Sequence, residues 1–259
     1  MTTTYTSYRL ISQDISKSLD RVAGKPDVAR ETEYYLANIG SIKSINDFMA
    51  DSRIYNYALK AHGLEDMAYA KAFIRKVLTE GVANEEAFAN KLADGRYAEL
   101  AKTFDFAMFG QATTSFDKAQ RGVVDNYLRQ TLEQDAGDDN AGVRLALYFE
   151  RKASTITSGM SVLADDALAA VVRVALGIPE EVAASDVDKQ AAFIEKSIDV
   201  EDFQDPEKVG LFLERFTAMW ELHNPSDNYD PLAVFGSSAG HGISPDLLLS
   251  INSLKLGGR

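Results

Sequence analysis

The stretch that comes closest to a catalytic signature is the pentapeptide GSSAG at residues 236–240, which fits the G-x-S-x-G turn of the α/β-hydrolases. In that fold the turn joins a strand of a parallel sheet to a helix, and the serine needs an acidic residue and then a histidine further along the chain. The only histidine that follows in this sequence is His241, directly beside the motif. We therefore interpret residues 236–240 as part of a linker and not as a nucleophilic site.

Metal-binding patterns are weaker still. Residues 135–146 superficially resemble an EF-hand calcium loop, but Asn140 stands where that loop needs glycine and Ala146 stands where it needs glutamate. None of the three histidines belongs to a Glu-x-x-His pattern. The chain has no cysteine, which excludes thiolate ligands, disulfides and cysteine nucleophiles. We predict no metal and no cofactor, and we expect His62 to lie at a helix end near the last carbonyls.

Acidic residues outnumber basic ones, 39 against 27, and the net charge is −12. In such a chain, neighbouring carboxylates such as Glu180 and Glu181 arise by chance and usually lie on a solvated face. The negative charge repels phosphate backbones, so we expect no nucleic acid partner. With no catalytic motif, we predict that the chain is not an enzyme. The alternative is an enzyme whose site uses carboxylates and tyrosines that the sequence does not single out.

The composition is that of a globular protein. A chain of 259 residues with 46% hydrophobic residues can bury a sizeable core. No apolar run reaches the roughly 18 residues that a membrane span needs, and the N-terminal residues lack the basic start and apolar core of a secretory signal. We therefore expect a cytoplasmic protein with no membrane span.

The elements that would position any site are predicted to be helices, and the clearest helix lies within residues 165–179. Asp165 can cap its start, Gly177 can end it in a left-handed conformation, and Pro179 cannot extend it because proline lacks an amide donor. Its apolar residues fall at i, i+3, i+4, i+7 and i+8, on one face of a helix. These residues are Leu168, Val171, Val172, Ala175 and Leu176.

A weaker copy of this helix lies 114 positions earlier, with Asp51 as the cap and Gly63 as the stop. Upstream of each helix, Tyr34-Tyr35 corresponds to Tyr148-Phe149 and Ser44 to Ser158. We therefore predict an internal duplication in which residues 33–66 and 147–180 follow the same helix, break, helix path.

The remaining pattern is helical as well. Residues 8–22 have the spacing of one amphipathic helix, and the apolar run 104–109 fits a helix or a strand by periodicity, of which we favour the helix or an irregular segment. Residues 115–135 are expected to form a long central helix that ends in a loop at residues 136–140, and Asn140 is expected to cap the next helix. Trp220 is expected to lie in the core.

These elements predict an all-α, multihelical fold with two diverged helical repeats, at about residues 33–104 and 147–222, joined by the central helix. We expect one domain over residues 1–223. Residues 224–242 are rich in Pro, Gly, Ser, Asn and Asp and are predicted to be a linker.

A short amphipathic helix is expected at the C-terminus, with Ser244 as its cap and Pro245 at its first position. Its apolar face is the candidate partner-binding site, with Leu247, Leu248, Ile251 and Leu254. So short a helix is unstable alone in water, because helix nucleation is unfavourable. We expect it to dock on a protein partner or on a second copy of the chain.

Several longer motifs resemble an uncharacterised alphaproteobacterial family, the domain-of-unknown-function family twelve-seventeen. They lie between about residues 5 and 222 and include SINDF at 44–48, AHGLED at 61–66, NKLAD at 90–94, GVRLALYFERK at 142–152 and ALGIP at 175–179. The resemblance implies a multihelical fold and, for many members, a gene beside those of flagellar basal-body rod components. It supplies no catalytic residues. The resulting hypothesis is a non-enzymatic helical protein that binds protein, as an accessory or assembly factor of the flagellum.

Overall fold

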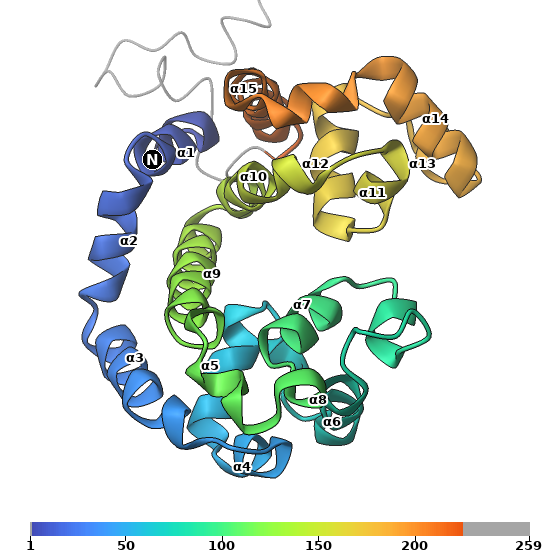
Figure 1. The fold of residues 1–259 in the computed structure, drawn as a ribbon. Coiled ribbons are helices and arrows are strands. Elements are labelled where there is room, and N and C mark those ends of the chain that lie inside the picture. The colour runs from blue at the N-terminus through green and yellow to red at the C-terminus, as the bar shows by residue number, and fades with distance from the viewer. Residues whose placement is uncertain (1, 225–259) are drawn as a thin grey trace, which may run out of the picture. The chain divides into compact units, whose positions relative to one another are not determined.

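The computed structural model describes residues 2–224, and within them every regular element is helical, so the all-α class is confirmed (Figure 1). In chain order the α-helices are α1 (Thr4–Ser12), α2 (Ile15–Ala23), α3 (Pro26–Asn38), α4 (Ile45–Ala50), α5 (Ser52–Ala61), α6 (Lys71–Glu80), α7 (Arg96–Thr103), α8 (Phe106–Phe109), α9 (Arg121–Asp139), α10 (Ala141–Lys152), α11 (Gly159–Leu163), α12 (Asp166–Leu176), α13 (Glu180–Ala183), α14 (Val187–Ser197) and α15 (Pro206–His223).

The chain divides into two units. Residues up to Trp220 form one compact unit, and the second unit comprises Glu221–Arg259, of which the structure describes Glu221–Asn224. Within the described residues, no helix has both the length and the apolar character that crossing a membrane requires.

The first unit contains two hydrophobic clusters. The first cluster draws on α2 to α9, and in it Tyr57 stacks on Tyr35 and on Tyr127, with ring centroids 4.5 and 3.8 Å apart. The second cluster draws on α9 to α15 and contains a triangle of aromatic rings, Phe149, Phe203 and Phe212, whose centroids lie 5.1 to 5.2 Å apart. Helix α9 contributes to both, because Leu132 belongs to the first cluster and Ala136 to the second.

The N-terminal helices pack against both clusters. Helix α1 contacts α10 and places Tyr8 in the second cluster, whereas α2 contacts α9 and places Val22 in the first (Figure 1). The prediction of one helix over residues 8–22 was wrong. The helix breaks after Ser12, and the Asp14 side chain caps α2 by accepting a hydrogen bond from the Lys17 amide at 3.0 Å.

Residues 33–66 and 147–180 contain the same order of elements. In each stretch a helix (α3 or α10) ends in a 3₁₀ turn (Ile39–Ser41 or Ala153–Thr155), and a short helix (α4 or α11) and a longer one (α5 or α12) follow. The atomic overlay of the two stretches stays a prediction.

Local hydrogen bonds recur at positions 114 residues apart. Ser44 caps α4 by accepting the Asp47 amide at 3.1 Å, and Ser158 caps α11 by accepting the Ser161 amide at 3.1 Å. The glycines that end α5 and α12 have positive φ, +68° at Gly63 and +60° at Gly177, which other residues rarely adopt. The shared cap and stop signals thus produce the same local geometry.

A tyrosine anchors each capping aspartate. The Tyr34 hydroxyl donates to Asp51 at 2.8 Å, and the Tyr148 hydroxyl donates to Asp165 at 2.5 Å. The other oxygen of each aspartate accepts two amides of the helix it caps. Each pair therefore ties the first helix of its stretch to the last one.

The long helix α9 begins and ends later than the sequence pattern indicates. Ser115 ends one 3₁₀ turn and residues 117–119 form another, and α9 continues through residues 136–139, so the prediction of a loop there was wrong. Arg144 packs on Gly137, where a Cβ atom would lie 2.7 Å from the Arg144 Cδ, so a larger residue would displace the arginine side chain. Asn140 then caps α10 as predicted, accepting the Gly142 and Val143 amides.

The structure also shows where the run 104–109 and Trp220 lie. The run 104–109 is helical in part, because Asp105 caps the single turn α8. Trp220 is half-buried and packs against the second cluster and on the backbone of Gly142, where a Cβ would lie 2.4 Å from the indole Cδ1.

We predict that Val172→Glu destabilises the fold severely. Val172 is fully buried in the second cluster, so the change forfeits about 1.5–3 kcal/mol of burial and adds a buried carboxylate without a partner. Thermal unfolding should show the melting temperature lowered by roughly 10 °C or more. The matched control is Val187→Glu, at a position that is 50% exposed, and it should melt near wild type. Equal melting of the two variants would contradict the assignment of this face.

Candidate functional site

The residues proposed from sequence as a binding site lie outside the described part of the chain. This holds for the apolar face of Leu247, Leu248, Ile251 and Leu254 and for the GSSAG motif at 236–240. Any site described from the structure must therefore be built from residues 2–224.

His62 lies directly after α5, as expected, and is buried. Its Nδ1 lies 2.7 Å from the Ala58 carbonyl oxygen and its Nε2 lies 3.1 Å from the Thr103 hydroxyl. Because a carbonyl only accepts, Nδ1 carries the proton and Thr103 donates to Nε2. Burial lowers the pKa of His62 and the hydrogen bond to Ala58 opposes this only in part. His62 is therefore a neutral residue that links α5 to α7.

The segment 135–146 is helical on both sides of Asn140, so its carboxylates do not form a loop around a common centre. In the part of the chain that the structure describes, no group of three or more His, Asp or Glu side chains is placed to hold a metal ion.

The strongest electrostatic feature is a buried carboxylate between two arginines. Glu133 is 1% exposed. Its Oε1 accepts from Arg129 Nε at 3.0 Å and from Arg151 Nε at 2.8 Å, and its Oε2 accepts from Arg151 Nη2 at 2.9 Å. Burial lowers the pKa of Arg151, but the hydrogen bond and charge of Glu133 outweigh burial, so the net shift is upward. This Arg–Glu–Arg network joins α9 to α10.

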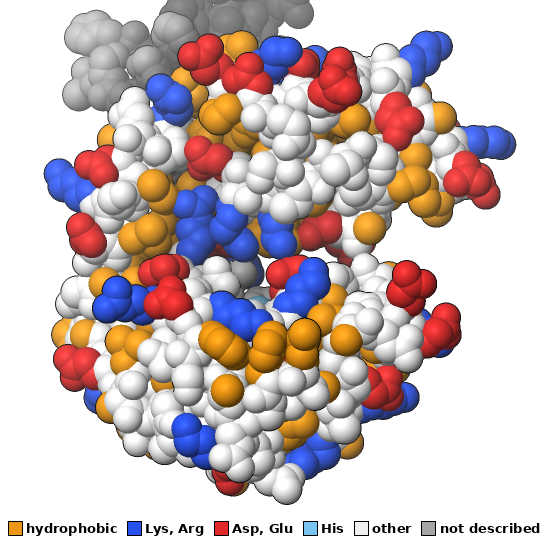
Figure 2. All heavy atoms as spheres, in the orientation of Figure 1, with side chains coloured by type: hydrophobic (Ala, Val, Ile, Leu, Met, Phe, Trp, Pro, Cys, Tyr) orange, Lys and Arg blue, Asp and Glu red, His pale blue; other side chains and the backbone are white. Residues whose placement is uncertain are grey.

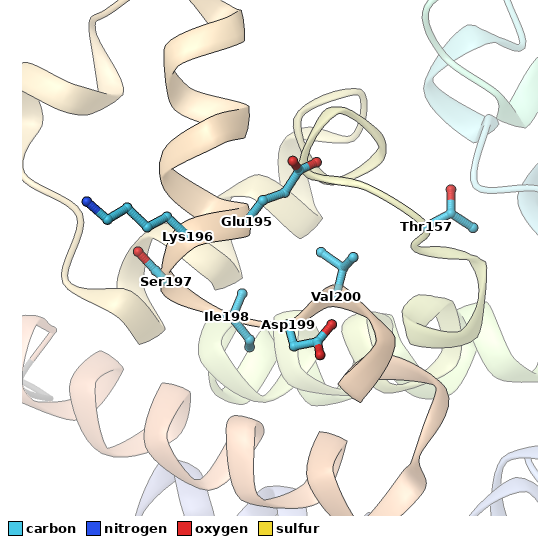
Figure 3. Close-up of a pocket in the computed structure, with 7 residues that line it drawn as sticks. All are labelled: Thr157, Glu195, Lys196, Ser197, Ile198, Asp199 and Val200. Atoms are coloured by element: carbon cyan, nitrogen blue, oxygen red, sulfur yellow. The ribbon is translucent and has the colours of Figure 1, made fainter.

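A depression of about 660 Å³ lies between the end of α14 and the segment before α11, and Figure 3 shows its lining residues. Its two carboxylates are both engaged in the backbone: Glu195 Oε1 accepts the Gly159 amide at 2.7 Å, and Asp199 accepts the Glu201 amide at 3.1 Å. Lys196 points away from Val200 and Thr157 (Figure 3). The carboxylates here hold the backbone together and form no acid–base pair.

An exposed apolar patch on and beside α8 is the best candidate for an interaction site. It consists of Met108, Phe109 and Phe116, which are 67%, 37% and 39% exposed. The two phenyl rings pack edge to face with centroids 5.0 Å apart, and Lys118 Nζ lies 5.1 and 5.9 Å from them. A preformed aromatic pair with a neighbouring cation is typical of the residues that dominate protein interfaces.

Sequence reasoning missed this patch. The periodicity of the run 104–109 fits a helix or a strand, and the sequence pattern places residue 116 within the long central helix expected at 115–135. The structure places Phe104 and Phe106 in the first cluster, whereas Met108 and Phe109 face solvent. Phe106, Met108 and Phe109 belong to the single helical turn α8, whose opposite sides face the cluster and solvent, and so short a turn is not visible from periodicity.

Comparison with known proteins identifies relatives without assigning a function. A family model described as "Protein of unknown function (DUF1217)" matches residues 61–209. An X-ray crystal structure of a structural-genomics target from Agrobacterium tumefaciens is similar, with 71% sequence identity, a TM-score of 0.80, and coverage of 86% of this chain and 94% of that chain. The comparison with curated proteins gives no match. The family resemblance seen in the sequence is thereby confirmed.

We predict that His62 makes stability depend on pH in the mildly acidic range. Because its folded pKa lies below the unfolded value of about 6.5, the unfolded chain binds more protons as the pH falls, and folding loses stability. Denaturant unfolding of wild type and His62→Gln should therefore show that the stability advantage of wild type shrinks between pH 7.5 and pH 5.5. Carboxylates titrate in both proteins and cancel in this difference. An advantage that is constant over this range would contradict a buried, neutral His62.

Proposed function

The chain belongs to the DUF1217 family of proteins of unknown function, and from that premise we propose that it is a non-enzymatic, helical protein-binding protein. The observation that carries the proposal is the exposed patch of Met108, Phe109 and Phe116. Solvation of such a patch costs free energy that a partner's apolar surface would recover.

The other exposed large apolar side chains of the described residues differ from the patch in their spacing. They are scattered along the chain, as Leu10 on α1 and Tyr69 before α6 illustrate, and the two that share a helix, Leu211 and Leu222 on α15, are eleven residues apart. Single exposed apolar residues are normal on protein surfaces. Only the segment 108–116 brings three of them together within nine residues, two in direct ring contact.

The C-terminal segment supplies a second binding element in this proposal. The leucine-rich pattern of residues 244–254 predicts an amphipathic helix that is too short to be stable alone in water. We expect this helix to dock on a partner or on a second copy of the chain, because the second cluster already contains Phe216, with Trp220 packed against it.

More specifically, we propose that the chain is an accessory or assembly factor of the flagellum. It rests on the gene neighbourhood that the family resemblance implies, beside flagellar basal-body rod genes. An enzyme with a carboxylate and tyrosine site is the alternative. Two tyrosine–aspartate pairs, Tyr34–Asp51 and Tyr148–Asp165, are close enough to hydrogen-bond, but both aspartates cap helices. We therefore favour binding over catalysis.

We predict that replacing the patch with Met108→Ser, Phe109→Ser and Phe116→Ser abolishes partner capture. Aromatic residues at the centre of an interface each contribute about 2 kcal/mol or more, so binding should weaken by at least roughly 30-fold. The measurement is affinity capture from the native cell at low salt, followed by titration of each captured protein against purified wild-type and variant chains.

The matched control carries Tyr69→Ser and Leu211→Ser, which remove exposed apolar residues elsewhere. It should capture the same proteins as wild type. Melting temperatures of both variants within about 2 °C of wild type establish that the fold is intact. If the patch variant binds the captured proteins as tightly as the control does, the patch is not the binding site.

We further predict that deletion of residues 225–259 leaves the first unit folded and removes self-association or partner capture. All described residues of both clusters are retained, so we expect the melting temperature to change by less than about 2 °C. Size-exclusion chromatography with light scattering, together with the capture assay, measures the loss. Unfolding on deletion would show that the C-terminal segment belongs to the core.

A further inference from the structure

A pocket of about 270 Å³ lies beside the joint between α1 and α2. Ser12 and Ile15 line it from the N-terminal helices, and Arg129, Glu150 and Arg151 line it from α9 and α10. Its size is at the lower end of ligand pockets, which suits an ion or a small molecule and excludes a large cofactor.

The two arginines of the pocket are only partly used by the protein. Arg129 donates from Nε to Glu133 and from Nη2 to the Leu147 carbonyl at 3.0 Å. Arg151 donates from Nε and Nη2 to Glu133. In each guanidinium, the two N–H groups of Nη1 have no hydrogen-bond partner among the described residues. Neither Nη1 is one of the fully buried polar atoms that lack a partner. Two pairs of donors thus remain for a solvent molecule or a ligand.

The charge of the pocket depends on Glu150. Glu133 balances one of the two arginines, and Glu150 Oε2 lies 3.9 Å from Arg129 Nη2. Burial raises the pKa of Glu150, although the charges of Arg129 and Arg9 and the hydrogen bond with Tyr8 oppose the rise. Protonation of Glu150 therefore leaves a surplus positive charge among Arg9, Arg129, Arg151 and Glu133.

The surroundings of the pocket are basic although the chain is acidic overall. Figure 2 shows Lys and Arg side chains gathered where α9 meets α10, in the view of Figure 1. The net charge of −12 makes such a concentration of cations unusual for this chain. A positive pocket in a negative protein selects small anions and disfavours polyanions.

From the pocket, its free arginine donors and its basic surroundings, we infer that the site binds a small oxyanion, a carboxylate or a tetrahedral anion such as phosphate or sulfate. In this proposal the Nη1 groups of Arg129 and Arg151 donate to the anion, as guanidinium groups do to oxyanions, and Ser12, whose side chain hydrogen-bonds with Tyr8, lines the pocket. Glu150 competes with the anion for Arg129. This site is independent of the patch at 108–116, so the failure of either proposal leaves the other standing.

The first test is isothermal titration of the full chain with sulfate, which keeps its charge between pH 5 and pH 8, at ionic strength held constant with sodium chloride. We expect saturable binding that tightens as the pH falls. Glu150→Gln should bind sulfate at least about tenfold more tightly than wild type at pH 8, because it removes the competing charge. Its affinity should change less than about twofold down to pH 5.

A second pair of variants tests the location of the anion site without changing a charged residue. Ser12→Leu should fill the pocket and weaken sulfate binding at least about tenfold, whereas Ser16→Leu, on the exposed face of α2, should bind like wild type. Titration of succinate into Glu150→Gln at pH 8 tests a carboxylate as the ligand. Tighter binding of succinate than of sulfate, or of sulfate than of succinate, supports the site and identifies its ligand class.

Absence of saturable binding of either anion to Glu150→Gln would overturn the proposal. So would sulfate affinity that is equal in wild type and Glu150→Gln at pH 8, or equal in Ser12→Leu and Ser16→Leu, because binding would then lie elsewhere on the surface.

Discussion

Glu133 is buried at the point on α9 where the chain passes from the first hydrophobic cluster, at Leu132, to the second, at Ala136. A carboxylate at this position is tolerated only if it is neutralised, because removing one partner of a buried ion pair costs about 3–5 kcal/mol. Arg129 supplies one guanidinium from the same helix, and Arg151 supplies the other from α10. Since Arg151 meets both carboxylate oxygens, the register of α10 on α9 is fixed by this contact, and with it the entry of the chain into the second cluster.

The same constraint explains where charge gathers. One buried carboxylate balances only one of two arginines, so the junction of α9 and α10 keeps a surplus of positive charge that Glu150 offsets according to its protonation. Both arginines line the pocket beside α1 and α2. The apolar patch at 108–116 follows from a different cause. Phe104 and Phe106 are drawn into the first cluster, and the turn that brings them there leaves Met108 and Phe109 in solvent.

What the sequence predicted well depends on interactions within a few residues. The caps at Asp165 and Asn140 and the left-handed stops at Gly63 and Gly177 are local, so their residue types indicate the geometry directly. The sequence predicts a loop at residues 136–140, but Gly137 lies inside α9 and packs against Arg144 of the next helix, a contact that local signals do not indicate. Glu133 resembled any surface acid, since its two arginine partners are recognised only after α9 and α10 are packed. The apolar patch at 108–116 was missed for the same reason, since its exposure is recognised only after the neighbouring helices are packed. The candidate binding residues within 247–254 lie outside the described part of the chain.

We expect the two clusters to unfold as one cooperative unit, because the Arg129–Glu133–Arg151 network couples α9 to α10. Native-state hydrogen exchange of the buried amides in α5 and α12 tests it most directly, since α5 belongs to the first cluster and α12 to the second. We predict that both sets of amides open with the same free energy, within about 1 kcal/mol, and that this free energy equals that of global unfolding. Opening of α12 at a free energy more than about 2 kcal/mol below that of α5 would contradict it, because the second cluster would then unfold independently of the first.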